Sequence, residues 1–65
     1  MRTGETELEM AVRHVAEQEE RIARQEALIE RLRRVGAPVD RSLKMLGEMK
    51  DFLETMRAHV ARLSD

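Results

Sequence analysis

RLRRVGAPVDR, residues 31–41, divides this 65-residue chain into two helical segments. The three arginines at its start are of the charge that stabilises the negative C-terminal end of a helix. Gly36 is the residue type that most readily adopts the left-handed conformation just after a helix, and Pro38 cannot continue one. A first helix is therefore expected to end near Arg34.

The first helix is expected to begin at a capping box at Thr6-Glu7-Leu8-Glu9. In such a box the hydroxyl accepts from the amide three residues later, and the glutamate reaches back. This places the first helix at about residues 7–34. The second helix is expected at about residues 39–63, with either Asp40 as its N-cap or Pro38 as its first residue.

Apolar residues recur every seven positions in both segments. In the first, Leu8, Val15, Ile22 and Ile29 have companions three residues later at Ala11, Gln18, Gln25 and Leu32; in the second, Leu46, Leu53 and Val60 are followed by Met49, Met56 and Leu63. This spacing is that of the seam of a left-handed helix pair. A short connection makes the pair antiparallel. The sequence predicts an all-α, antiparallel two-helix hairpin forming one domain over residues 1–65, frayed at residues 1–5.

The apolar face is wider than one partner helix can cover. Met45 and Phe52 flank the second seam, and further apolar residues lie beside the first at Val12, Leu28 and Val35. A chain this short rarely buries a sufficient core alone, and it has no cysteine for disulfides. A homodimer that forms a four-helix bundle is therefore expected. The residues expected at its interfaces are Leu8, Val15, Ile22, Ile29, Leu32, Met45, Leu46, Met49, Phe52, Leu53, Met56, Val60 and Leu63.

The charged face of the first segment carries acid-before-base pairs at i,i+4 spacing, which indicates the side exposed to solvent. They are Glu9–Arg13, Glu17–Arg21, Glu20–Arg24 and Glu30–Arg34. Gly47, inside the second segment, costs about 1 kcal/mol relative to alanine in a helix. We expect a close helix–helix contact at that level.

Two glutamines occupy seam positions seven residues apart, Gln18 and Gln25. If they are buried, polar side chains at such positions set the register and the choice of partner at a cost in stability. If the helices are rotated slightly, both amides reach solvent instead. The sequence leaves these alternatives open.

The two histidines, His14 and His59, are expected at similar heights of the hairpin. With Glu17 three residues after His14, they are the candidate ligands of a metal site or a pH-responsive pair. The Glu-x-x-His pattern of di-iron bundles is missing. The favoured reading is that both histidines are rim residues, and no metal or other cofactor is predicted.

Charge gives no support for a nucleic-acid partner. The chain has 12 basic and 13 acidic residues, a net charge of -1, and arginines that alternate with glutamates. No exposed aromatic residue is expected for stacking on a base. In length and architecture the chain resembles Rop, the plasmid RNA-binding regulator, but a shared fold does not carry function. A Rop-like nucleic-acid binder is the second hypothesis.

Other functional classes lack their sequence signals. There is no serine–histidine–acid arrangement and no glycine-rich phosphate loop, so the chain is not expected to be an enzyme. The N-terminal residues lack the apolar region of a signal peptide, and no apolar run is long enough for a membrane span, so a cytoplasmic protein is expected. The methionines at positions 10, 45, 49 and 56 are expected to fill the core, or else to form an adaptable surface.

Residues 14–36 read HVAEQEERIARQEALIERLRRVG. This segment resembles one in small uncharacterised helical proteins of alphaproteobacteria, in which H-V-A-E, I-x-R-Q and a closing L-x-x-x-G share this spacing. The resemblance covers about a third of the chain. It implies a bacterial cytoplasmic origin and draws interest to His14, Glu17, Arg24 and Gln25, and it supplies no mechanism. The leading hypothesis is a homodimeric bundle that acts on an unidentified protein partner, as an adaptor or regulatory subunit.

Overall fold

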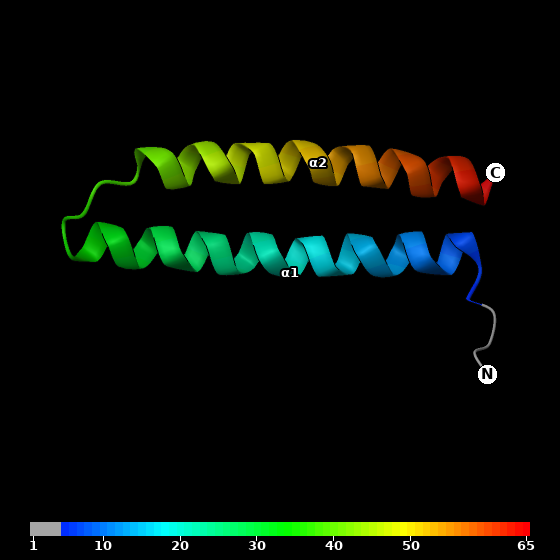
Figure 1. Cartoon of the computed structure of the whole chain (residues 1–65), viewed down its shortest axis with the longest axis horizontal. Helices are drawn as coiled ribbons and strands as arrows, with labels where there is room; N and C mark the ends of the chain where they lie inside the picture. Colours follow the sequence, from blue (N-terminus) through cyan, green and yellow to red (C-terminus); the bar gives the residue numbers. More distant parts are fainter. Residues whose placement is uncertain (1–4) are drawn as a thin grey trace.

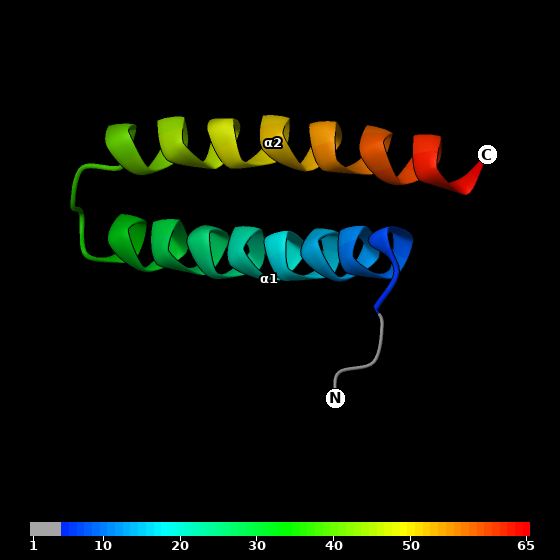
Figure 2. The same cartoon turned by 45° about the vertical axis from the view of Figure 1, so that its right-hand side comes forward.

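The computed structural model describes residues 5–65, which form two helices joined by a short connection. The first, α1, spans Glu7–Arg34, and the second, α2, spans Asp40–Ser64. The helices lie side by side and run in opposite directions, so the start of α1 and the end of α2 lie at the same end of the hairpin (Figure 1 and Figure 2). The all-α prediction and the pairing of the two helices are confirmed.

The first helix begins at the capping box expected from the sequence. Glu9 N–H donates to the Thr6 hydroxyl over 3.0 Å, and Thr6 N–H donates to the Glu9 carboxylate over 2.9 Å. Glu5, just before the box, forms an ion pair with Arg13 at 2.9 Å, and this guanidinium lowers the pKa of Glu5. Residues 1–4, part of the segment predicted to fray, lie outside the described residues.

The turn closes with a Schellman motif around Gly36, whose φ is 73°. The Ala37 amide donates to the carbonyl of Leu32 over 2.9 Å, and the Gly36 amide donates to that of Arg33 over 3.1 Å. These two bonds satisfy carbonyls that the end of a helix otherwise leaves unpaired. The turn therefore follows from one glycine, as its position in the sequence indicates.

The second helix begins differently from either sequence alternative. Asp40 is its first helical residue, and the N-cap position is held by Val39, which offers no side-chain acceptor. The Leu43 amide donates to the Val39 carbonyl over 2.8 Å, the first helical bond of α2. Asp40 is thus not the N-cap, and Pro38 lies in the connection. Asp40 still stabilises α2 by placing a negative charge in its first turn.

Burial follows the seven-residue pattern closely. Every seam residue of both helices is buried or half-buried, and Leu28 and Ser42 are the only other helical residues within residues 5–65 that share this burial. The buried seam residues are Ala11, Gln18, Ile22, Ile29 and Leu53. The two helices therefore contact along one narrow strip with the spacing of a coiled coil.

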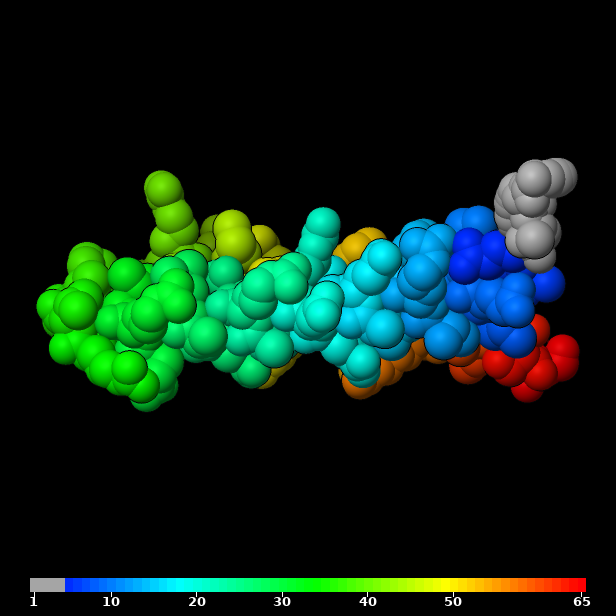
Figure 3. All heavy atoms as spheres, turned by 90° about the horizontal axis from the view of Figure 1, so that it is seen from below, coloured from blue at the N-terminus to red at the C-terminus, as the bar shows by residue number. Residues whose placement is uncertain are grey.

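The hairpin is a rod one helix thick. Its Cα atoms extend 48 Å along the helices and 12 Å in the shortest direction. Figure 3 shows α1 in front, with atoms of α2 visible along its edges, so each helix covers only one side of the other. No side chain among the described residues reaches less than 2% exposure. Neither helix has an apolar stretch of the length that crossing a membrane requires.

The surface ion pairs of α1 differ in part from those expected. Glu20–Arg24 forms at 3.7 Å. The Glu9 carboxylate instead serves the capping box, and Arg13 pairs with Glu5 and Glu17. The local spacing marked the exposed side of α1 but did not select the partners, because neighbouring glutamates compete for one guanidinium.

The surroundings of Gly47 differ from the close helix–helix contact expected from the sequence. It is exposed, and a Cβ built on it meets no atom within 4 Å, so no helix–helix contact inside the hairpin requires glycine there. Gly47→Ala is therefore expected to raise the free energy of unfolding by about 1 kcal/mol, through helix propensity alone. Chemical denaturation followed by circular dichroism measures this change.

Gly36→Ala is the matched control for that substitution. It also adds one methyl group in open space, but at a positive φ. It is expected to lower the free energy of unfolding by about 1 kcal/mol. A loss of stability in Gly47→Ala would show that another chain packs against that position.

Candidate interaction surface

Two glutamines link α1 to the backbone of α2. The Gln18 side-chain amide donates to the Met49 carbonyl over 3.0 Å, and the Gln25 amide donates to the Ser42 carbonyl over 3.0 Å. Gln18 is 5% exposed and Gln25 is half-buried. Of the two alternatives left open by the sequence, the structure therefore has the amides turned toward the partner helix.

The two hydrogen bonds repeat with the seam. Their donors lie seven residues apart on α1, and their acceptors lie seven residues apart on α2. A sliding movement of one helix by a single turn would separate both amides from their carbonyls. The price of burying an amide is offset only while this bond is made, so the pair favours a single register.

One edge of the seam is closed by ion pairs between the helices. Glu19 binds Arg57 at 2.7 Å, and Glu26 binds Lys50 at 3.5 Å. The hydrogen bond from Arg57 to the Glu19 carboxylate raises the pKa of that arginine. These pairs also repeat at seven residues on each helix. We call the side of the hairpin that carries them the closed face.

These interhelical ion pairs were not predicted, although the sequence carries a signal for them. The acidic and basic members all lie directly after or four residues after a large apolar seam residue, which is the flank of a coiled-coil seam where such pairs form. The pairs predicted from spacing all lie within α1. Which residue of α2 faces which residue of α1 depends on the register, and this information comes from the fold.

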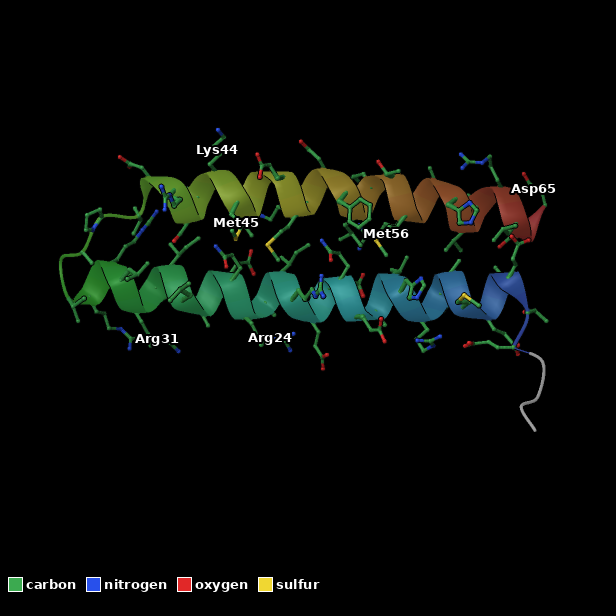
Figure 4. All side chains as sticks on the ribbon, in the orientation of Figure 1. Arg24, Arg31, Lys44, Met45, Met56 and Asp65 are labelled. Carbon is green, nitrogen blue, oxygen red and sulfur yellow. The ribbon has the colours of Figure 1, made fainter. Side chains whose placement is uncertain are left out.

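The opposite side of the seam, the open face, exposes apolar side chains. Met45 and Phe52 are 50% and 55% exposed. They line a shallow pocket of about 240 Å³ together with Gln18, Arg21 and Met49. In Figure 4, Met45 and Met56 lie on the side of α2 nearest α1, whereas Lys44 points away from it. Apolar atoms on this face remain in contact with solvent.

The histidines lie at one end of the open face. His14 and His59 both line a pocket of about 290 Å³, whose other lining residues include Met56 and Arg62. Glu17 lines the neighbouring pocket with His14 and not this one. Within residues 5–65 there is no group of three or more histidine, cysteine or acidic residues arranged to hold a metal ion. The structure thus brings His14 and His59 to one pocket and leaves Glu17 beside it.

The residues expected at interfaces divide into two groups in the hairpin. The larger group lies in the α1–α2 seam and is buried or half-buried: Leu8, Val15, Ile22, Ile29, Leu32, Leu46, Met49, Leu53, Met56, Val60 and Leu63. The second group, Met45 and Phe52, is exposed on the open face. These two have no partner inside the hairpin that would account for their apolar character.

Comparisons of the chain with protein families, with curated proteins and with solved structures found no match. The open face and the closed face therefore have to be interpreted from their own chemistry.

Gln18→Glu tests the buried glutamine bond. The substitution keeps the shape of the side chain but turns an oxygen toward the Met49 carbonyl, which leaves a charged group without a donor. We expect the free energy of unfolding at neutral pH to fall by about 2 kcal/mol or more. Gln25→Glu is the matched control, and its loss should be smaller because that side chain is half-buried.

The loss in Gln18→Glu is expected to depend on pH. Burial raises the pKa of the introduced carboxyl above its unfolded value of about 4.3. The protonated carboxyl can donate to the carbonyl, so the loss relative to the native chain is small below that unfolded value. It grows as the pH rises through the raised pKa. Equal losses at all pH values would contradict a buried amide donor at this position.

Proposed function

We propose that the protein is a homodimeric four-helix-bundle module that acts through protein–protein contacts, as an adaptor or a regulatory subunit. The observation that carries the proposal is the open face. Met45 and Phe52 are half exposed there, although every apolar seam residue beside them is at least half-buried. A second copy of the chain, packed with its open face against the first, would cover these side chains.

The thinness of the hairpin supports association with another chain. A core of one strip between two helices, with five buried residues, is small for a stable domain. Stable bundles of this length normally enclose their apolar side chains between four helices. Packing two open faces together converts a layer one helix thick into such an enclosure, and places Gln18 and Gln25 beside the new core.

The composition of the open face suits a protein partner. Methionine, aromatic residues and arginine are the types enriched at protein interfaces. Here they occur together as Met45, Met49, Phe52, Met56 and Arg21. The flexible thioethers can repack against different shapes, which fits a module whose role is to hold other proteins. The closed face, with its ion pairs, suits the surface of the bundle that remains in solvent.

A basic cluster at the turn favours a second candidate, a Rop-like nucleic-acid-binding regulator. The cluster comprises Arg31, Arg33, Arg34, Arg41 and Lys44, all exposed. Such a cluster could contact phosphates. The only aromatic residue of the chain, Phe52, lies on the open face near the middle of α2, far along the rod from this cluster. Protein contact is therefore the better supported of the two.

Phe52→Glu tests the dimer. The substitution places a charge in the proposed subunit interface, so the chain is expected to sediment at the mass of one copy at concentrations where the native chain is dimeric. Val12→Glu is the matched control. Val12 is similarly exposed, at 50%, but lies on the other side of the seam in a small pocket with Val15, Arg57 and Val60.

The control variant is expected to keep the dimer mass. Sedimentation equilibrium of the three chains under the same conditions gives the comparison. Dissociation by Val12→Glu and not by Phe52→Glu would assign the subunit interface to the closed face. A native chain that stays monomeric at high concentration would refute the dimer.

Native mass spectrometry of the complex purified gently from its own cells tests the adaptor role. The expected species contains two copies of the chain and a further protein. The Phe52→Glu chain is expected to lose this species if the bundle is needed for partner binding. A species of two copies with nothing attached counts against an adaptor, and attached nucleic acid would favour the second candidate.

A further inference from the structure

The charges of the hairpin are distributed unevenly along its length. The midpoint of α1 lies between Glu20 and Arg21, and the midpoint of α2 is Phe52. Arg21 and Phe52 line the same pockets, so the two midpoints lie at the same height. This height divides the rod into a turn half, residues 21–52, and a terminal half, residues 5–20 and 53–65.

The two halves have opposite net charge. The turn half contains eight basic and five acidic residues, a net charge of +3 with neutral histidines. The terminal half contains three basic and eight acidic residues, a net charge of -5. The rod is 48 Å long, several times the distance of about 8 Å over which physiological salt screens exposed charges. Each half therefore interacts mainly with whatever lies directly beside it.

Two arrangements place the open faces of two copies against each other with twofold symmetry. If the axis runs along the helices, both turns lie at the same end, and α1 packs on the α2 of the other copy. If the axis crosses the helices within the interface, the turns lie at opposite ends. In that case α1 packs on α1 of the other copy, and α2 packs on α2 of the other copy. Neighbouring helices are antiparallel in both arrangements, so helix dipoles do not distinguish them. The side-chain charges do.

From this charge distribution we infer that the dimer is antiparallel, with each turn half packed on the terminal half of the other copy. This inference rests on the proposed dimer and specifies its arrangement. A parallel dimer would bring the basic turn clusters of both copies together at one end, and the acidic halves together at the other. The antiparallel dimer places a half with net charge +3 beside a half with net charge -5, and it does so twice. Electrostatic complementarity favours this arrangement.

The positions along α1 match this arrangement. Glu17 and Arg24 are equally distant from the midpoint of α1, as are Glu7 and Arg34. In an antiparallel packing of α1 on its copy, Glu17 of each chain therefore lies level with Arg24 of the other. Glu17 lines a pocket of the open face, and Arg24 follows one heptad later on the same side of the helix. Each such pair occurs twice in the dimer.

The apolar residues of α2 match it as well. Phe52 is at the midpoint of α2 and exposed on the open face, so in the antiparallel dimer it lies next to Phe52 of the other copy. Aromatic rings paired in this way add to the stabilisation from their buried area. Met45, seven residues before Phe52, lies level with His59 of the other copy. In the parallel dimer, Phe52 would instead face the level of Arg21.

Spin-label distances test the arrangement directly. The chain has no cysteine, so Ser64→Cys gives one labelling site per copy, at the open end. Ser64 lies twelve residues after Phe52. In the antiparallel dimer the labels are expected to be separated along the bundle by about 36 Å, at a rise of about 1.5 Å per residue. In a parallel dimer they would lie within about 20 Å, the width of a four-helix bundle.

A charge exchange tests the same arrangement independently. Glu17→Lys and Arg24→Glu, each alone, place like charges opposite each other twice, and each is expected to weaken the dimer by about fivefold or more. The double variant is expected to recover the native dissociation constant. Within one helix these positions are separated by about 10 Å along the axis, so recovery reports a contact between copies.

The outcomes separate this inference from the proposal beneath it. A monomeric native chain would refute both. A dimer with a short label distance, or with no recovery in the double variant, would overturn the antiparallel arrangement and leave the dimer in place. A long distance together with recovery would establish it.

Discussion

The structure depends on one narrow contact, the seam along which α1 and α2 pack. Apolar residues recur on it every seven positions, and the buried apolar residues among residues 5–65, Ala11, Ile22, Ile29 and Leu53, all lie on it. The turn prevents a slip of a whole heptad, because the Schellman motif at Gly36 fixes the length of the connection. The bonds from Gln18 and Gln25 oppose smaller slips, because each amide reaches one carbonyl only. A single register follows from these two constraints together.

The same seam makes the two sides of the hairpin different. On the closed face, Glu19 and Glu26 form ion pairs across the seam with Arg57 and Lys50. On the open face the corresponding positions of α2 are Met45 and Phe52, which cannot form such pairs. The closed face therefore carries ion pairs between the helices beside the seam, whereas the open face carries Met45 and Phe52 exposed to solvent. Stability and association are linked as a result, since whatever covers the open face also stabilises the hairpin.

The charge distribution makes the two ends of the hairpin different. Exposed ion pairs contribute little to stability individually, but separation of charge along a rod constrains how two rods align. The basic residues gather near the turn and the acidic residues near the chain ends. Contact area and charge thus act on different properties of the proposed dimer. The apolar side chains provide the driving force, and the charges select between two arrangements that bury the same faces.

The sequence by itself determined the two helices, the capping box at Thr6, the turn at Gly36 and the identity of the seam. These features depend on residues within about one or two helical turns of each other, and local conformational preference and seven-residue spacing are sufficient to predict them. The first residue of α2 could not be predicted in the same way, because Val39 caps that helix with its carbonyl and its side chain gives no capping signal. Only the tertiary structure decided that Gln18 and Gln25 face α2, that Glu19 pairs with Arg57, and that one side of the seam is open. Those features depend on the rotation of each helix about its axis and on their relative register, which are fixed only when the two helices pack together.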